Sequence, residues 1–231
     1  MQTGLPRLRR RAHATALAFV SALSLLLSAA CSRKPDSQQA AGPKQGTEVL
    51  FRLMQAAWNQ VFTVEGSGEY RMAKIALYRG EQETPCGKVS RGVHYCPSGR
   101  LVSADLGWLE EAKKAQPAAP AYLLARTLAR HVQHQLTIEE RVEKAIAADP
   151  RKKDELLRQR EMQAECFVGL WRRNHEGQAP SPDELKSAAR WWSEQGGEAP
   201  PASTLEERMR WFDRGLAAEE IGACNVFARQ R

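Results

Sequence analysis

Two histidines one helical turn apart are the first candidates for metal chemistry in this chain of 231 residues. His131 and His134 stand at i and i+3 in a stretch with helical periodicity, so their imidazoles would lie on one helix face. Two neutral imidazoles on one face can share a metal ion. Isolated histidines on helices are more often packing or surface residues, and the sequence alone leaves both interpretations open.

The cysteines are the second set of residues with chemistry. Five are present, and Cys31 belongs to an export signal described below, which leaves four in the remaining chain. An even number in an exported protein predicts two disulfides. Three pairings are possible, and the short separation of Cys86 and Cys96 around a possible hairpin favours Cys86–Cys96 with Cys166–Cys224. A zinc site of cysteines is disfavoured because the chain has no CxxC motif.

Residues 1–31 have the three zones of a secretory signal. Arginines come first, an apolar run extends from Ala14 to Leu27, and small residues lead to Cys31. The apolar run is shorter than the roughly 20 residues that span a bilayer. The ending LSAAC resembles a bacterial lipobox, in which Cys31 would be acylated and become the mature N-terminus. We therefore expect a lipoprotein, anchored by more than one acyl chain.

Two alternatives to lipidation stay open, namely ordinary cleavage after Ala30 and retention of the segment as an uncleaved anchor. All three place the protein outside the cytoplasm, in the cell envelope. Ser32 after the cysteine favours the outer membrane by resemblance to Gram-negative lipoproteins. Residues 32–46 have two prolines and no large apolar side chain, which predicts a flexible tether between the membrane and a single domain over 47–231.

The formal net charge of +7 does not indicate a nucleic-acid partner. Four of the positive charges lie in the signal segment, and without them 30 basic residues face 27 acidic ones, a net charge of +3. Such a mixed surface is typical of a solvated protein. The arginines concerned are Arg7, Arg9, Arg10 and Arg11.

The first half of the domain combines one helix with short strands. Apolar residues repeat with helical spacing over Thr47–Phe62, and Lys74–Tyr78 is a candidate for a short strand. Two more strands, around His94-Tyr95 and over Leu101–Ala104, flank a turn that contains Pro97 and Gly99, and Leu106–Lys114 is expected to be helical.

The second half is predicted to consist of helices. One covers Ala121–Leu136, and four start signals follow: Thr137 with Glu140 as a capping box, Asp149-Pro150, Ser181-Pro182, and Thr204 with Glu207. The expected fold class is α+β, a small sheet packed by several helices. The tryptophans on these amphipathic helices are predicted to be core residues: Trp171, Trp191, Trp192 and Trp211.

Four stretches together resemble the neutral zinc metallopeptidases of bacterial cell envelopes. They are TPCG with HYCPSGRLVSADLGWLEE, then AYLLARTLARHVQHQL, then EMQAECFVGLW, and finally SPDEL with RMRWFDRG and ACNVF. The second resembles the helix that carries HEVGHHVQ in active relatives, and the third resembles the family's ELQADC-x-AG-x-W. The similarity covers about residues 47–227 and implies a zincin-like fold. It also supports the disulfides Cys86–Cys96 and Cys166–Cys224.

The same resemblance shows that the catalytic motif is degenerate. In HExxH, two histidines bind zinc and the glutamate activates water. Those positions map to Arg126, Thr127 and Arg130. A guanidinium has no lone pair for a metal, two cations one turn apart repel a divalent ion, and threonine cannot act as a general base near neutral pH. We expect no catalytic residues and no bound zinc.

The family's third metal ligand maps to Glu161, and Glu165 lies one turn further on, where the family has aspartate. We expect the charges of Arg126 and Arg130 to replace that of the zinc and to pair with Glu161, and with Glu165 as a further partner. The alternative is that both arginines lie on a solvated helix face.

These observations predict a membrane-anchored, catalytically inactive relative of the metallopeptidases that binds a peptide or a protein partner and no nucleic acid. One alternative is an active metallopeptidase with a rebuilt zinc site at His131, His134 and Glu161. Another is a purely structural lipoprotein.

Overall fold

The structure is a computed structural model that describes residues 42–175, 179–197 and 203–227. The signal segment 1–31 with Cys31, and the tether from residue 32 to residue 41, lie outside the described residues. The expected tether boundary at residue 46 needs correction, because helix α1 spans Pro43–Glu65. Pro43 stands in the first turn of α1, where its fixed φ suits a helix start.

A three-stranded sheet follows α1, with strand order β1-β5-β4. β1 (Lys74–Tyr78) pairs in parallel with β5 (Leu101–Asp105), and β4 (Val93–Cys96) pairs antiparallel with β5. These are the three strands that the sequence predicts. A short turn over Pro97–Gly99 joins β4 to β5, and α2 (Leu106–Ala115) follows directly.

A second, two-stranded sheet consists of β2 (Gln82–Thr84) and β3 (Gly87–Val89), which the sequence pattern does not predict. Three-residue strands with polar side chains carry too little hydrophobic pattern to be recognised. The disulfide Cys86–Cys96 fixes this hairpin to the end of β4.

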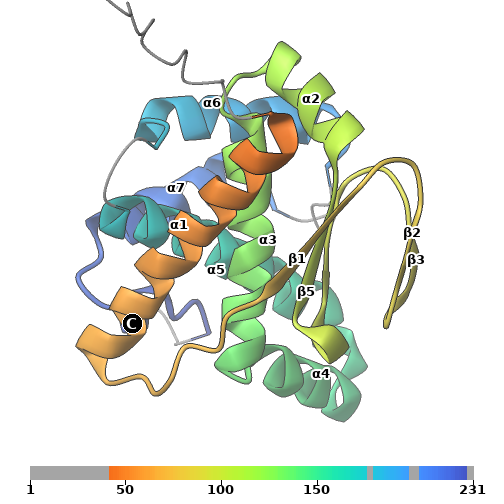
Figure 1. The fold of residues 1–231 in the computed structure, drawn as a ribbon. Coiled ribbons are helices and arrows are strands. Elements are labelled where there is room, and N and C mark those ends of the chain that lie inside the picture. The colour runs from red at the N-terminus through yellow and green to blue at the C-terminus, as the bar shows by residue number, and fades with distance from the viewer. Residues whose placement is uncertain (1–41, 176–178, 198–202, 228–231) are drawn as a thin grey trace, which may run out of the picture. The chain divides into compact units, whose positions relative to one another are not determined.

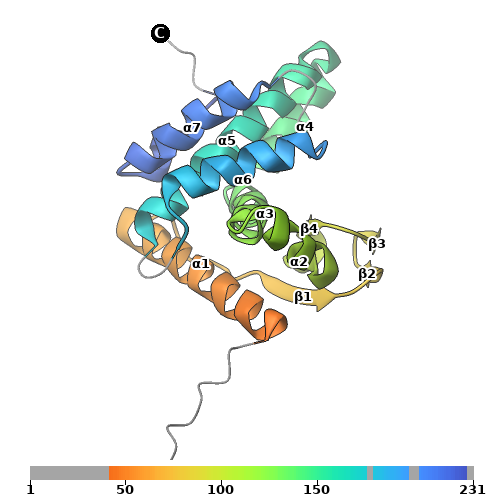
Figure 2. The same ribbon diagram turned by 90° about the horizontal axis from the view of Figure 1, so that it is seen from above.

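Helix α3 (Ala119–Gln135) is the central element, as Figures 1 and 2 show. It contacts several other elements, namely α1, α2, α4, α5, α6 and β4. In Figure 2, α3 is seen almost end-on between the sheet and the group formed by α5, α6 and α7. Because its neighbours cover it from several directions, even polar side chains on α3 are buried, among them Arg126, His131 and Gln133.

The turn from α3 into α4 (Ile138–Ala148) corrects one prediction. Thr137 precedes the helix as expected, but it adopts a left-handed conformation with φ of 56° and makes no side-chain cap. A capping box needs an extended residue at this position. Glu139, in the first turn of α4, binds arginines of neighbouring helices instead.

Helix α5 (Lys153–Asn174) begins after a short 3-10 turn at Pro150–Lys152, which the side chain of Asp149 caps. Helices α6 (Pro182–Glu194) and α7 (Leu205–Ala217) begin with the predicted signals, and both have complete capping boxes. The disulfide Cys166–Cys224 links α5 to the final turn η3 (Ile221–Cys224). Both disulfides are the pairs that the resemblance implies.

Helices α5 and α7 lie unusually close together because a glycine stands on each side of their contact. A Cβ atom on Gly215 would collide with the backbone of Cys166, and one on Gly169 would collide with the backbone of α7. This approach places the side chain of Arg208 next to α5. Both positions therefore require glycine because a larger residue would collide with the facing helix. The backbone dihedral angles themselves would allow other residues.

The tryptophans are only partly in the core. Trp171 is fully buried, whereas Trp191, Trp192 and Trp211 are half-buried and cover other side chains. Within the described ranges, no helix has the length and apolar character needed to cross a membrane.

Candidate functional site

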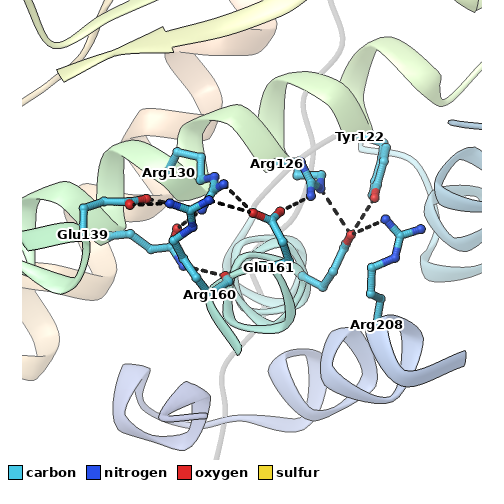
Figure 3. Close-up of polar contacts among 9 residues, drawn as sticks. Tyr122, Arg126, Arg130, Glu139, Arg160, Glu161 and Arg208 are labelled. Atoms are coloured by element: carbon cyan, nitrogen blue, oxygen red, sulfur yellow. Dashed lines mark hydrogen bonds and ion pairs between the residues drawn. The ribbon is translucent and has the colours of Figure 1, made fainter. Parts of the chain in front are cut away.

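A line of charged side chains lies between α3 and α5, among the residues for which the sequence predicts ion pairs (Figure 3). Tyr122, Arg126 and Arg130 follow one another at intervals of four residues, so α3 presents all three on one face. Glu161 and Glu165 have the same spacing on α5, and their carboxylates contact these side chains. The two helices therefore meet through complementary charges.

Glu161 is the centre of this arrangement. Arg126 binds one of its carboxylate oxygens through Nη2, and Arg130 binds the other through Nη2. Arg160 approaches the same carboxylate at 3.4 Å. The side chain of Glu161 is only 4% exposed and that of Arg126 only 9%. The alternative of two arginines on a solvated helix face is therefore wrong.

Glu165 extends the network toward α7. Its Oε1 accepts hydrogen bonds from the Tyr122 hydroxyl at 2.8 Å and from Nε of Arg126 at 3.3 Å. Arg208 of α7 lies 3.7 Å from the same oxygen and is fully buried. The indole of Trp192 lies over the guanidinium groups of Arg126 and Arg208, with centroid distances of 4.3 and 5.4 Å, which adds cation–π contacts.

Glu139 of α4 closes the other end. Its carboxylate binds Arg130 at 3.2 Å and Arg160 at 3.0 Å. We call the complete set the Arg–Glu network. It has four cations and three carboxylates: Arg126, Arg130, Arg160, Arg208, Glu139, Glu161 and Glu165.

The electrostatics of Glu161 follow from these contacts. Burial by itself raises the pKa of this carboxyl, but Arg126, Arg130 and Arg160 outweigh burial and lower the pKa below its usual value. For Arg126 the acids likewise outweigh burial, and its pKa is raised. Both partners are therefore ionised at neutral pH. Thr127, between Arg126 and Arg130 on α3, is half-buried.

His131 lies on a different face of α3 and takes no part in the network. Its Nδ1 is 3.0 Å from the hydroxyl of Tyr95 in β4, and its Nε2 is 2.7 Å from the backbone carbonyl oxygen of Arg71. Burial lowers the pKa of His131 to about 4, so the ring is neutral at pH 7. The carbonyl must accept from Nε2–H, and the Tyr95 hydroxyl therefore donates to Nδ1.

The residues of the alternative zinc site are therefore not brought together. Both ring nitrogens of His131 are engaged, and the carboxylate of Glu161 is bound by arginines. His134 packs its ring against Tyr95 at a centroid distance of 6.1 Å. Among residues 42–175, 179–197 and 203–227, no group of three or more His, Cys, Asp or Glu side chains is placed to hold a metal ion.

Four members of the site region were not predicted from the sequence. The spacing of Tyr122 from Arg126 on α3 is a signal that could have identified it. Glu139 lies within a predicted helix cap, and Arg160 looks like a surface residue in a charged stretch. Arg208 lies in an amphipathic helix, and only the close approach of α7 to α5 shows that it is buried.

Comparisons with known proteins agree with the resemblance. The model of the family described as "Putative neutral zinc metallopeptidase" matches residues 23–189. Two Escherichia coli proteins, each named uncharacterized protein YpfJ and found in strains K12 and O6:H1, are 31% identical to this chain over 147 residues. The match covers 61% of this chain and 50% of each relative, so the chain spans about half the length of the curated relatives it matches. No solved structure matches.

Proposed function

The chain belongs to the family of putative neutral zinc metallopeptidases, and from this premise we propose that it is a catalytically inactive member that binds peptide or protein partners in the cell envelope. The observation that carries the proposal is the pairing of Arg126 and Arg130 with Glu161. By the resemblance, these three residues occupy the positions of the two zinc-binding histidines and the third ligand.

The donor set at these positions does not fit zinc. A guanidinium stays protonated and offers no lone pair, so neither Arg126 nor Arg130 can ligate a metal. The carboxylate of Glu161 is a group that can bind a metal, but both of its oxygens are bound by arginines. A zinc ion at this place would lie next to several positive charges, which Coulomb repulsion opposes.

The general base is missing as well. The position after Arg126 is Thr127, whose hydroxyl does not titrate near neutral pH. Glu165 and Tyr122 are hydrogen-bonded to each other and buried, so neither is placed to activate water for a substrate. The network instead connects α3, α4, α5 and α7. Its role in this proposal is to hold the helices of a zincin-like fold in position without a metal.

Anchoring and location complete the proposal. The signal-like residues 1–31 with Cys31 support a lipid anchor, and the two disulfides support an oxidising compartment. An anchored domain that keeps the family's scaffold and lacks its catalytic groups would bind a partner without cleaving it.

The test is an assay of the full chain against a peptide library, with and without added zinc and chelator. We expect peptide binding without cleavage. Chelator-sensitive cleavage would overturn the inactive assignment. Absence of both binding and cleavage would favour the purely structural lipoprotein.

A further inference from the structure

A cavity of about 520 Å³ lies between α4, α5 and the C-terminal turn η3. This volume is in the range of small-molecule sites. Most of its wall is apolar, formed by Leu136, Ile138, Val142, Leu156, Phe167 and Ile221. The cavity is not part of the Arg–Glu network, so a ligand could bind in it whether or not the protein is an inactive peptidase.

One cation stands in this wall. The guanidinium of Arg141 is held in place because its Nε and Nη2 donate to the backbone carbonyl oxygens of Thr137 and Leu136, at 3.2 and 2.9 Å. Among the described residues, Arg141 has no acidic partner, and no acidic side chain lines the cavity. Its Nη1 therefore remains available to an anionic group at the opening.

The other polar groups of the wall are already engaged. Gln163 donates to the carbonyl oxygen of Cys224 at 3.1 Å and accepts from Gln133 at 3.1 Å. The side-chain oxygen of Asn225 accepts from the backbone N–H of Phe227. A bound peptide would leave its own N–H and C=O groups without partners here, which is costly. An alkyl chain has no such groups.

The wall is also firmly held. The disulfide Cys166–Cys224 ties η3 to α5, and the carboxylate of Glu65 at the end of α1 accepts from the backbone N–H of Ile221 at 2.8 Å. The cavity is therefore preformed, and a ligand would not have to order its wall on binding.

We propose that this cavity binds a fatty acid, with the alkyl chain against the apolar wall and the carboxylate at Arg141. A single cation beside an apolar cavity matches a ligand with one anionic group and one alkyl chain.

The proposal is tested by calorimetric titration of the full chain with dodecanoate below its micelle concentration, and with dodecanol as the uncharged probe of equal length. Arg141→Gln should weaken dodecanoate binding about tenfold, as expected for loss of a charged hydrogen-bond partner, and leave dodecanol unchanged. Lys144→Gln is the matched control, because Lys144 is a cation on the same helix outside the cavity, and it should bind like the wild type.

Two further variants test the cavity itself. Ala145→Phe should fill it and abolish binding of both probes, and Leu156→Glu should repel dodecanoate more than dodecanol. Leu156 is half-buried, so this second variant keeps the test valid if Ala145→Phe fails to fold. The proposal is overturned if wild-type protein does not bind dodecanoate, if Arg141→Gln and Lys144→Gln weaken it equally, or if folded Ala145→Phe binds it normally.

Discussion

Two faces of α3 bury polar groups in opposite ways. On the face toward α5, Arg126 and Arg130 keep their charges and are matched by Glu161 and Glu165. On the face toward β4, His131 loses its charge and is held as a neutral ring between Tyr95 and the carbonyl of Arg71. A buried titratable side chain can stay charged beside an opposite charge, or it can lose its charge. We expect these two arrangements to respond differently to mutation and to pH.

The largest effect is expected on the charged face. Glu161→Gln removes the negative charge that the guanidinium groups of Arg126 and Arg130 share, so positive charge in the buried network is no longer balanced. Loss of one member of a buried ion pair costs about 3–5 kcal/mol. Chemical denaturation of the variant and the wild type measures this difference directly.

The matched control is Glu110→Gln. Glu110 pairs with Arg79 near the surface, where their side chains are 35% and 58% exposed, so its loss should change stability much less than the loss of Glu161. If the two substitutions lower the free energy of unfolding equally, the buried Arg–Glu network contributes no more to stability than a surface ion pair.

The neutral face should respond to pH. Because the pKa of His131 is lowered to about 4 in the folded protein, the unfolded chain binds a proton first as the pH falls from 6.5. Stability should therefore decrease between pH 6.5 and pH 4, by about 3 kcal/mol from this group. In His131→Gln, this part of the pH dependence should vanish, and parallel stability curves for variant and wild type would contradict the neutral ring.

The charged face also responds to acid, but at lower pH. The pKa of Glu161 is below its usual value, so its ionised form stabilises the fold above the unfolded-state pKa near 4.5. This contribution is lost as the pH falls through the lower folded-state pKa. In a plot of the free energy of unfolding against pH, the loss due to His131 should therefore occur at higher pH than the loss due to Glu161.

The glycine contact between α5 and α7 positions the outer part of the charged face. Gly215→Ala places a methyl group against the backbone of Cys166 and should push α7 away, separating Arg208 from Glu165. We expect a loss of about 3 kcal/mol, at the upper end for overpacking. Gly46→Ala in α1 meets open space and serves as the control. Thermal unfolding compares the two, and similar melting temperatures would argue against the close contact.

The smallest effect concerns the hydrogen bond that holds the neutral ring. Tyr95→Phe leaves Nδ1 of His131 without its donor and should cost about 1 kcal/mol. Tyr70 also packs on His131, but within the described residues its buried hydroxyl has no hydrogen-bond partner. Tyr70→Phe should therefore be neutral or stabilising in the same denaturation experiment, and an equal loss in both variants would contradict the assigned hydrogen bond.

The sequence predicts the local structure well where one segment contains its own signals. The short apolar run in Lys74–Tyr78 forms a strand as predicted, and the starts of α6 and α7 have complete capping boxes. Thr137 has the residue type of a cap, but at the α3–α4 turn it adopts a left-handed conformation and its side chain makes no cap. The roles of Arg208 and Glu139 depend on helices far apart in the sequence, so no local pattern reveals them.

We propose that the guanidinium groups of Arg126 and Arg130 take the place of a metal ion beside Glu161, and the zinc content of the protein tests this proposal. Purified full-length protein, loaded with zinc and dialysed, should retain none, whereas Arg126→His with Thr127→Glu and Arg130→His should retain one zinc ion per chain. Adding Glu161→Gln to this triple variant should weaken the binding. Stoichiometric zinc in the wild-type protein, lost on Glu161→Gln, would contradict the account.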